Sequence, residues 1–290
     1  MRETVMVLGS SGMAGHMIAR YLEETAEVDV LEVGPRTKVS DRTLLCDLSA
    51  PGALDRLLDE TRPGALVNCV GVLVKASEER KDEAVWINAY LPRLLAKACV
   101  ACGCRLIHLS SDCVFSGRDG PYGIRDACDA EDFYGRTKIL GEVREAPALS
   151  VRTSIIGPAL RPGDTGLFGW YTRQRGQVPG YVNALWSGVT TLELAKFLRF
   201  VIMERRDLSG LIHYAVDGGI SKYALLSAIR SEFGTGARVI PSAEPRIDRR
   251  LAFDPGIAGM TPESYEVQLA ELRRWMDARG DLYGTHGDAA

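Results

Sequence analysis

Short apolar runs alternate with amphipathic stretches along the first half of the chain, beginning almost at its first residue. Apolar runs of this length, separated by segments long enough for a helix, are typical of buried parallel strands joined by helical crossovers. We therefore predict an α/β fold with a doubly wound parallel sheet. The predicted strands are residues 4–8, 28–33, 44–47, 65–71, 105–111 and 149–156, and the predicted helices are residues 16–24, 54–62, 83–102 and 132–146.

A glycine-rich loop joins the first predicted strand to the first predicted helix. Its sequence is Gly9-Ser-Ser-Gly12-Met-Ala-Gly15. Gly9 permits a tight turn, Gly12 lets the backbone approach a phosphate, and Gly15 allows the helix to pack closely on the strand. Because a strand precedes this loop and a helix follows it, the motif predicts the pyrophosphate site of a dinucleotide-binding, Rossmann-type domain.

The residues at the end of the second predicted strand help to predict whether the bound dinucleotide is NADPH or NADH. An NAD-preferring site has an acidic residue there for the ribose 2′-hydroxyl, whereas this chain has Gly34-Pro35-Arg36. Arg36, together with Lys38, could pair with a 2′-phosphate, so we predict NADPH, with NADH as the alternative. Two other interpretations stay open. Glu32 could contact the ribose, although it falls inside the predicted strand, and Arg36 could be a solvated loop residue.

Tyr134 and Lys138 carry the candidate chemistry. They lie four residues apart in a predicted helix and therefore on one face of it. A phenol has an ordinary pKa of about 10, and a nearby ammonium lowers that pKa, which makes the tyrosine a usable general acid or base. The preceding strand ends in Ser110 and Ser111, so Ser111 could hydrogen-bond the carbonyl that Tyr134 protonates. The alternative is an exposed Tyr/Lys pair and two serines that only cap a turn.

The sequence changes in character after residue 157. Residues 158–185 are rich in Gly, Pro, Arg and aromatic residues, which suits a substrate loop better than another strand–helix unit. The pattern then predicts a helix, a strand and two further helices, at residues 189–204, 211–216, 222–233 and 262–279. We predict a dinucleotide-binding domain and a smaller C-terminal substrate-binding lobe, formed by residues 1–157 with 186–216 and by residues 158–185 with 217–290, respectively.

Composition and charge narrow the function classes. Hydrophobic residues make up 46% of the 290-residue chain, and the formal net charge is −3 without a basic run, so no nucleic-acid partner is expected. No apolar stretch approaches the roughly 20 residues that a membrane-spanning helix needs, and the early strand leaves no room for a signal peptide. The odd number of cysteines, seven, is unlike a secreted disulfide framework and predicts a reducing cytoplasm. Cys99, Cys102 and Cys104 lack a further pair to complete tetrahedral ligation, so no metal is expected.

A series of motifs, taken in order, resembles a known family. The motifs are GSSGMAG from Gly9, NCVG from Asn68, IN ending at Asn88, LSSDCVFSG from Leu109, YGRTK from Tyr134 with a following GE, VRTSIIGP from Val151, and ISKYALL from Ile220. The chain resembles the extended short-chain dehydrogenases/reductases, and most of all the dTDP-4-dehydrorhamnose reductase group, from about residue 5 to about residue 251. The resemblance implies an NAD(P)-dependent oxidoreductase of deoxysugar and polysaccharide biosynthesis, which reduces the C4 keto group of a nucleotide-linked 4-keto-6-deoxysugar. We also expect a homodimer.

The resemblance also implies roles for individual residues. Ser111 would bind the carbonyl, Tyr134 would donate the proton, and Lys138 would bind the ribose, while Asp47, Val70 and Gly71 would line the adenosine side. The expected cofactor-binding residues are Gly9, Ser11, Gly12, Met13, Arg36, Asp47, Leu48, Val70, Gly71, Asn88, Tyr134, Lys138 and Ile155. The expected substrate-binding residues are Ser111, Asp112, Cys113, Tyr134, Arg173, Trp186, Arg249 and Arg250.

We include the arginines in this set because the expected substrate carries a diphosphate. An acidic chain must concentrate positive charge locally in order to bind it. Trp170-Tyr-Thr-Arg173-Gln-Arg175 places aromatic side chains beside two arginines, and Arg246-Ile-Asp-Arg249-Arg250 forms a second basic segment. An aromatic ring next to arginine suits a base that stacks and a phosphate that pairs. The alternative is that these are surface arginines that only solubilise an irregular lobe.

Two departures from the group's pattern concern the substrate. The group has Thr-Asp-Tyr where this chain has Ser111-Asp112-Cys113, so the tyrosine ring is missing at position 113. Residues 123–126, Gly-Ile-Arg-Asp, stand where acidic residues commonly follow a Gly-Pro-Tyr turn. A nucleotide-sugar epimerase or dehydratase is one alternative, but the dehydratases' Asp-Glu pair is absent because Cys113 follows Asp112. A non-catalytic, NADP-binding regulatory subunit is the other, and it would have no need of Ser111, Tyr134 and Lys138 together.

Overall fold

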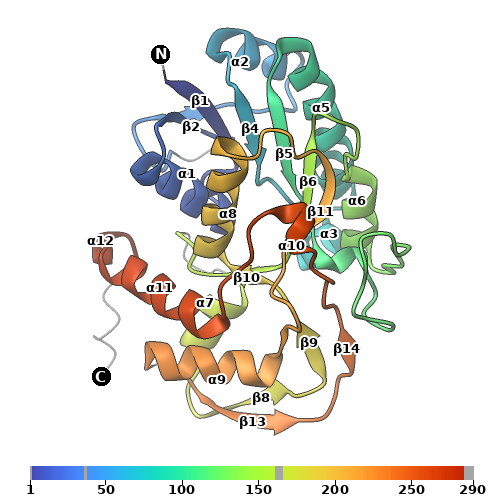
Figure 1. The fold of residues 1–290 in the computed structure, drawn as a ribbon, viewed down its shortest axis with the longest axis vertical. Helices are drawn as coiled ribbons and strands as arrows, with labels where there is room; N and C mark the ends of the chain where they lie inside the picture. The colour runs from blue at the N-terminus through green and yellow to red at the C-terminus, as the bar shows by residue number, and fades with distance from the viewer. Residues whose placement is uncertain (1, 36–37, 161–165, 235, 284–290) are drawn as a thin grey trace.

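A seven-stranded parallel sheet forms the centre of the protein in a computed structural model, which describes residues 2–35, 38–160, 166–234 and 236–283 (Figure 1). Its strand order is β11-β6-β5-β4-β1-β2-β3, and all neighbouring pairs are parallel. The strands are β1 (Glu3–Leu8), β2 (Val28–Gly34), β3 (Thr43–Leu45), β4 (Ala65–Asn68), β5 (Arg105–Leu109), β6 (Leu149–Arg152) and β11 (Gly210–His213). The predicted doubly wound α/β sheet is confirmed, and its strand order reverses between β1 and β4, where folds of this kind bind their ligands.

Helices cover both faces of this sheet because its central strands are apolar on both sides. In β1, Val5 and Val7 belong to the core beneath α1 (Met13–Thr25) and α8 (Thr191–Met203). Met6 and Leu8 belong to the opposite core, beneath α2 (Ala53–Thr61) and α5 (Leu91–Cys102). These four side chains are at most 1% exposed. Successive strand residues point to opposite faces, so a strand buried on both faces has the uninterrupted apolar run seen in the sequence.

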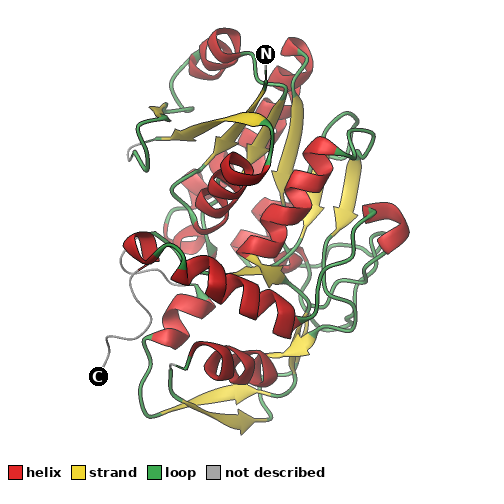
Figure 2. Ribbon diagram, turned by 60° about the vertical axis from the view of Figure 1, so that its left-hand side comes forward, coloured by secondary structure: helices red, strands yellow, loops and turns green. Residues whose placement is uncertain are grey.

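Two of the three smaller sheets of the described residues lie at the end of the molecule farthest from the N-terminus, and the two-stranded sheet of residues 155–156 and 189–190 lies between them and the large sheet (Figures 1 and 2). The three smaller sheets comprise β7 (Ile155–Ile156) with β10 (Val189–Thr190), β8 (Gln177–Tyr181) with β13 (Arg238–Ser242), and the three-stranded sheet of β12 (Ile220–Ser221), β9 (Ala184–Trp186) and β14 (Ile247–Asp248). The helices α7 (Leu167–Thr172), α9 (Lys222–Phe233) and α11 (Tyr265–Asp277) lie near the smaller sheets (Figure 1). α10 (Pro255–Ala258) lies beside β11 of the large sheet, and α12 (Gly280–Tyr283) contacts α1 through Tyr283 and His16. The predicted division into a domain and a lobe stays a prediction, which this arrangement supports.

Several element bounds differ from the predicted ones. The predicted helix at residues 83–102 is interrupted, since α4 (Lys81–Ala84) leads into a π-helix at Val85–Tyr90 before α5 begins. The predicted strand at residues 149–156 is split into β6 and β7, which belong to different sheets. Residues 158–185, expected to be a loop, contain α7 and β8. Two short helices, α3 (Val74–Glu79) and a 3₁₀ turn at Asp112–Val114, were not predicted.

The helix of Tyr134 ends earlier than predicted. α6 spans Phe133–Gly141, not residues 132–146. A Cβ added to Gly141 would lie 1.9 Å from the backbone oxygen of Asn88, so only glycine allows this close contact with the π-helix. Glu142 then leaves the helix with extended backbone angles, and its carboxylate turns to Arg152.

Two further observations concern membrane-spanning helices and the state of the cysteines. Among the described residues, every helix is too short or too polar to cross a lipid bilayer. All seven cysteines are free thiols, and the described residues hold no group of three or more His, Cys, Asp or Glu side chains with metal-ligand geometry.

Candidate active site

The glycine-rich loop has the backbone geometry that a phosphate cradle requires. Gly9 has a φ of +80°, a conformation that favours glycine, and its N–H donates to the Val33 carbonyl at 2.8 Å. A Cβ added to Gly15 would lie 2.2 Å from the Gly9 oxygen, so the first turn of α1 approaches the loop as closely as it can. Gly12 precedes α1, whose first residue is Met13, and no side chain caps that end. The first N–H groups of the helix are therefore left for a ligand.

The loop after β4 is fixed from beneath by Asn88. The Asn88 side chain accepts a hydrogen bond from the Val72 N–H at 2.8 Å and donates to the Val72 carbonyl at 2.9 Å. It also donates to the Thr137 hydroxyl on α6 at 3.2 Å. Asn88 is fully buried, so it ties the Val70–Val72 segment to the helix that carries Tyr134. Its predicted contact with the cofactor stays a prediction.

Around β2 and β3, the carboxylates already have partners. Glu32 accepts hydrogen bonds from Ser40 and Thr43, at 2.6 and 2.7 Å. Asp47, just after β3, is exposed and accepts from the backbone and the hydroxyl of Ser49, at 3.0 and 2.6 Å. Arg36, which we predict to face the 2′-phosphate, lies outside the described residues.

Ser111, Tyr134 and Lys138 come together beyond the carboxyl end of β5. Tyr134 is the second residue of α6, whose N-cap Asp132 accepts from the Gly135 N–H at 2.7 Å. A Cβ on Gly135 would lie 2.4 Å from the Cys113 carbonyl, so this turn packs directly on the Ser111–Cys113 segment. The Tyr134 hydroxyl is close enough to the Ser111 side chain for the two to interact, and the Lys138 ammonium donates to the Leu109 carbonyl at 2.7 Å.

The electrostatics of Tyr134 correct one expectation. Burial raises the pKa of the Tyr134 phenol above its ordinary value, and the neighbouring Ser111 side chain lowers it only in part. Burial also lowers the pKa of the Lys138 ammonium to about 8. Lys138 therefore does not depress the tyrosine pKa in this structure, because its ammonium is turned to the backbone of β5. A phenol is protonated at neutral pH, which is the form a proton donor needs, but a raised pKa makes Tyr134 a weaker acid in this structure than the predicted Tyr/Lys pair.

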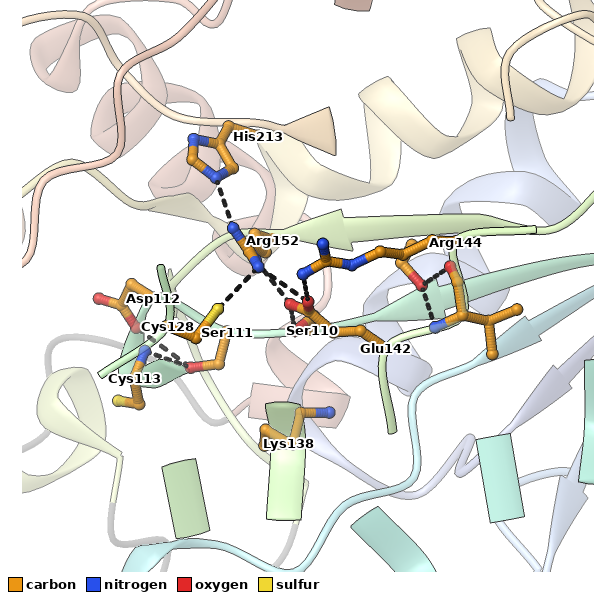
Figure 3. A network of polar contacts seen from close by, with 12 residues as sticks. Ser110, Ser111, Asp112, Cys113, Cys128, Lys138, Glu142, Arg144, Arg152 and His213 are labelled. Atoms are coloured by element: carbon orange, nitrogen blue, oxygen red, sulfur yellow. Dashed lines mark hydrogen bonds and ion pairs between the residues drawn. The ribbon is translucent and has the colours of Figure 1, made fainter. Parts of the chain in front are cut away.

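A buried ion pair lies directly behind these residues (Figure 3). The Arg152 guanidinium, which is fully buried, donates to the two carboxylate oxygens of Glu142 at 2.6 and 2.8 Å. Glu142 also accepts from the Ser110 hydroxyl at 2.9 Å, which links the pair to the residue before Ser111. The Arg152 hydrogen bonds, together with the charge, hold the pKa of the Glu142 carboxyl below its usual range despite burial.

His213 completes this network on the side of the C-terminal strands. Its Nε2 lies 3.3 Å from Arg152 Nη1, and its Nδ1 lies 3.0 Å from the Ala252 carbonyl. Burial lowers the pKa of the imidazole to about 4, so the ring is neutral at physiological pH. We assign the proton to Nδ1, since only that tautomer lets the ring accept from Arg152 and donate to Ala252. Sequence reasoning missed this network, although the GE and VRTSIIGP motifs contain Glu142 and Arg152.

On the predicted substrate side, Asp112 and Arg249 lie beside Ser111 and Cys113, respectively. Asp112 is buried and accepts from the Ser111 hydroxyl at 3.1 Å. Arg249, just after β14, donates to the Cys113 sulfur at 3.4 Å. Arg250 differs, because its guanidinium forms a bidentate ion pair with Asp248, at 2.9 and 2.7 Å. Arg173 lies exposed at the end of α7.

Lys222 is a functional candidate that sequence reasoning missed. It is the first residue of α9, and its ammonium lies 4.4 Å from the centroid of the Trp186 ring. Asp112, Cys113 and Arg249 are the groups whose charges act on it. Lys222 therefore joins the predicted substrate residues. It stands in the ISKYALL motif, but the motif alone gave it no role.

The fold and the site define a Rossmann-type protein with a serine, a tyrosine and a lysine at the carboxyl ends of its strands. The family model described as "RmlD substrate binding domain" matches residues 1–282, and the chain belongs to this family. The chain is similar to a dTDP-4-dehydrorhamnose reductase of Mycolicibacterium smegmatis, with 26% identity over 97% of this chain and 85% of that protein. It is equally similar to methionine adenosyltransferase 2 subunit beta of Danio rerio, at 26% identity over 92% of this chain and 83% of that protein.

Solved structures show the same fold. The structure of dTDP-4-dehydrorhamnose reductase from Bacillus anthracis in complex with NADP superposes with a TM-score of 0.79, at 21% identity, over 95% of this chain and 100% of that one. A dTDP-4-dehydrorhamnose reductase from Clostridium acetobutylicum gives a TM-score of 0.76 at 23% identity, over 94% of this chain and 99% of that one. The predicted fold class and the resemblance to this family are confirmed.

Proposed function

We propose that this protein reduces the C4 keto group of a nucleotide-linked 4-keto-6-deoxysugar with NADPH. The observation that carries the proposal is the junction of Ser111, Tyr134 and Lys138 beside a glycine-rich dinucleotide loop. Relatives that match nearly the whole chain are named dTDP-4-dehydrorhamnose reductase, and a structural neighbour of that name is bound to NADP. The three side chains also favour an enzyme over a binding subunit, because binding alone would not require them.

The residues around the glycine-rich loop suit NADPH. Gly9, Gly12 and the uncapped start of α1 would hold the pyrophosphate, with Ser11 and Met13 beside it. Val70 and Gly71 would line the adenosine side, with Leu48 and Asp47 across from them, and Ile155 would lie near the nicotinamide. Glu32 is engaged by Ser40 and Thr43, which supports NADPH over NADH, since an NAD site uses a free carboxylate at this strand end. When bound, NADPH supplies the hydride.

The chain's own residues would supply the remaining chemistry. The Ser111 hydroxyl would hydrogen-bond the carbonyl oxygen of the substrate, and Tyr134 would give that oxygen its proton. Tyr134 carries its proton at neutral pH, as an ordinary phenol does, and burial raises its pKa further. Lys138, with a pKa of about 8, would bind the ribose and can return a proton to the tyrosine. The Ser111 proton is donated to Asp112 in this structure, so Ser111 would turn it from Asp112 to the carbonyl oxygen when the substrate binds. Trp186 and Arg249 would contact the substrate, whereas Arg173 and Arg250 would belong to the lobe around it.

The proposal is tested by comparing a nucleotide-linked 4-keto-6-deoxysugar with the same keto sugar lacking its nucleotide, at equal concentration with NADPH. We expect NADPH oxidation only with the nucleotide-linked substrate, because binding energy from the remote nucleotide is needed to place the keto group at Tyr134. Equal turnover of the free sugar would contradict the proposed substrate class. The predicted homodimer and cytoplasmic location are part of this proposal, and gel filtration with light scattering tests the former.

A further inference from the structure

Lys222 is a cation in a place that disfavours its charge. It occupies the first turn of α9, where the positive end of the helix dipole destabilises an ammonium. Burial lowers the pKa of Lys222 to about 8. Within the described part of the chain its ammonium has no hydrogen bond and no ion pair, and only the Trp186 ring lies over it at 4.4 Å. The ammonium of Lys222 is therefore available to pair with a bound anion, and its charge contributes little to the stability of the fold.

Arg249 is a second cation that faces the same place. Its guanidinium donates to the Cys113 sulfur and to the Ser116 carbonyl, both at 3.4 Å, and has no carboxylate partner among the described residues. The neighbouring Arg250 is different, because Asp248 already neutralises it. The sequence predicts that Arg249 and Arg250 both bind the diphosphate. Of these two arginines, only Arg249 is without a carboxylate partner among the described residues.

The three-stranded sheet of the lobe holds these groups together. Ser221, the residue before Lys222, is paired with Leu185 in β9, and the Arg249 N–H donates to the Leu185 carbonyl. The loop that contains Gly117 also packs on Arg249, since a Cβ on Gly117 would lie 3.0 Å from Arg249 Cγ. Asp112 is the carboxylate that acts on Lys222, so two cations face one carboxylate and leave net positive charge beside Ser111.

We propose that Lys222 and Arg249 form one anion-binding site beside the reacting carbonyl, which takes an acidic group of the substrate. The acidic group is a phosphate of the nucleotide, since a 4-keto-6-deoxysugar has no carboxylate. Arginine and lysine both bind phosphate through charge-assisted hydrogen bonds. Lys222 thereby replaces Arg250 as the second cation of the site and determines which substrates bind. This inference rests on the proposed nucleotide-sugar substrate.

The test is equilibrium binding to the full chain in the presence of NADP⁺. Wild type is compared with Lys222→Met, which removes the charge and keeps the length of the side chain. Lys75→Met is the matched control, since Lys75 is exposed on α3 and its contact with Glu79 is 3.8 Å long. The probes are dTDP-glucose, dTDP-glucuronate and inorganic pyrophosphate. Because binding is measured and not turnover, the result stands whether or not the keto sugar is reduced.

We expect Lys222→Met to weaken binding of dTDP-glucose, dTDP-glucuronate and pyrophosphate about 10- to 100-fold, the range of a lost charge-assisted hydrogen bond. Equal losses for dTDP-glucose and dTDP-glucuronate identify the phosphate, and a loss confined to dTDP-glucuronate would overturn the proposal, because the two cations would then bind the sugar carboxylate. The midpoint of thermal unfolding should not fall and the Kd of NADP⁺ should not rise, because the ammonium has no hydrogen bond and no ion pair with a described residue. Affinities within about twofold of wild type for all probes would overturn the proposal, and so would a wild type that binds none of them.

Discussion

Replacing Tyr134 by phenylalanine is expected to lower kcat about 10²- to 10⁴-fold, the usual contribution of a positioned general acid. The substitution removes only the hydroxyl, which meets Ser111 beside the proposed carbonyl site. The ring keeps its packing, so the Kd of NADPH should stay within a few-fold of wild type. Steady-state kinetics and cofactor titration, measured on the same preparation, check both halves of this prediction.

Tyr90→Phe is a matched control for that experiment. Tyr90 is 53% exposed at the end of the π-helix and has no hydrogen bond with a described residue. Its loss of a hydroxyl should leave kcat unchanged. If Tyr134→Phe turned over as fast as Tyr90→Phe, Tyr134 would not be the proton donor, and the role proposed for Ser111 would fall with it.

The second large effect concerns stability. Glu142→Gln should destabilise the protein by about 3–5 kcal/mol, because it leaves the Arg152 guanidinium buried without a counter-charge. Arg152 is fully buried, and Glu142 is 2% exposed, so solvent does not screen the pair. For a chain of this size, the midpoint of thermal unfolding should fall by roughly 6–20 °C. Calorimetry measures this shift directly.

The control for this prediction is an exposed ion pair of the same chemistry. Glu131 pairs with Arg118 on the surface, with side chains that are 68% and 60% exposed. Glu131→Gln should change the unfolding free energy by less than about 1 kcal/mol. The double variant Glu142→Leu with Arg152→Met should lose less stability than Glu142→Gln alone, since no charge is then left buried. Equal effects of Glu142→Gln and Glu131→Gln would show that the buried network contributes little.

What the sequence predicts correctly is local. The glycine-rich loop, the strand before it and the helix after it depend on residues within a few positions of one another. Tyr134 and Lys138 share a helix face for the same reason. The order of motifs along the chain is enough to predict the sheet, because each strand–helix unit adds one parallel strand.

What the sequence does not predict depends on contacts between distant residues. His213 meets Arg152 across 61 positions, and Arg249 meets Cys113 across 136. The early end of α6 has the same cause, since Gly141 packs on Asn88 and Glu142 turns away to reach Arg152. The direction of the Tyr134 pKa also depends on burial, which residue spacing does not reveal. Lys222 is a functional candidate only once Trp186 and Arg249 are placed around it.

The position of hydride delivery tests the central claim most directly. The protein is incubated with NADPH deuterated at the transferring position and a nucleotide-linked 4-keto-6-deoxysugar, and the product is examined by NMR. We predict one deuterium per product, bound to C4, and loss of this product in Tyr134→Phe. Deuterium at another carbon of the sugar, or no consumption of NADPH, would contradict a C4 reductase.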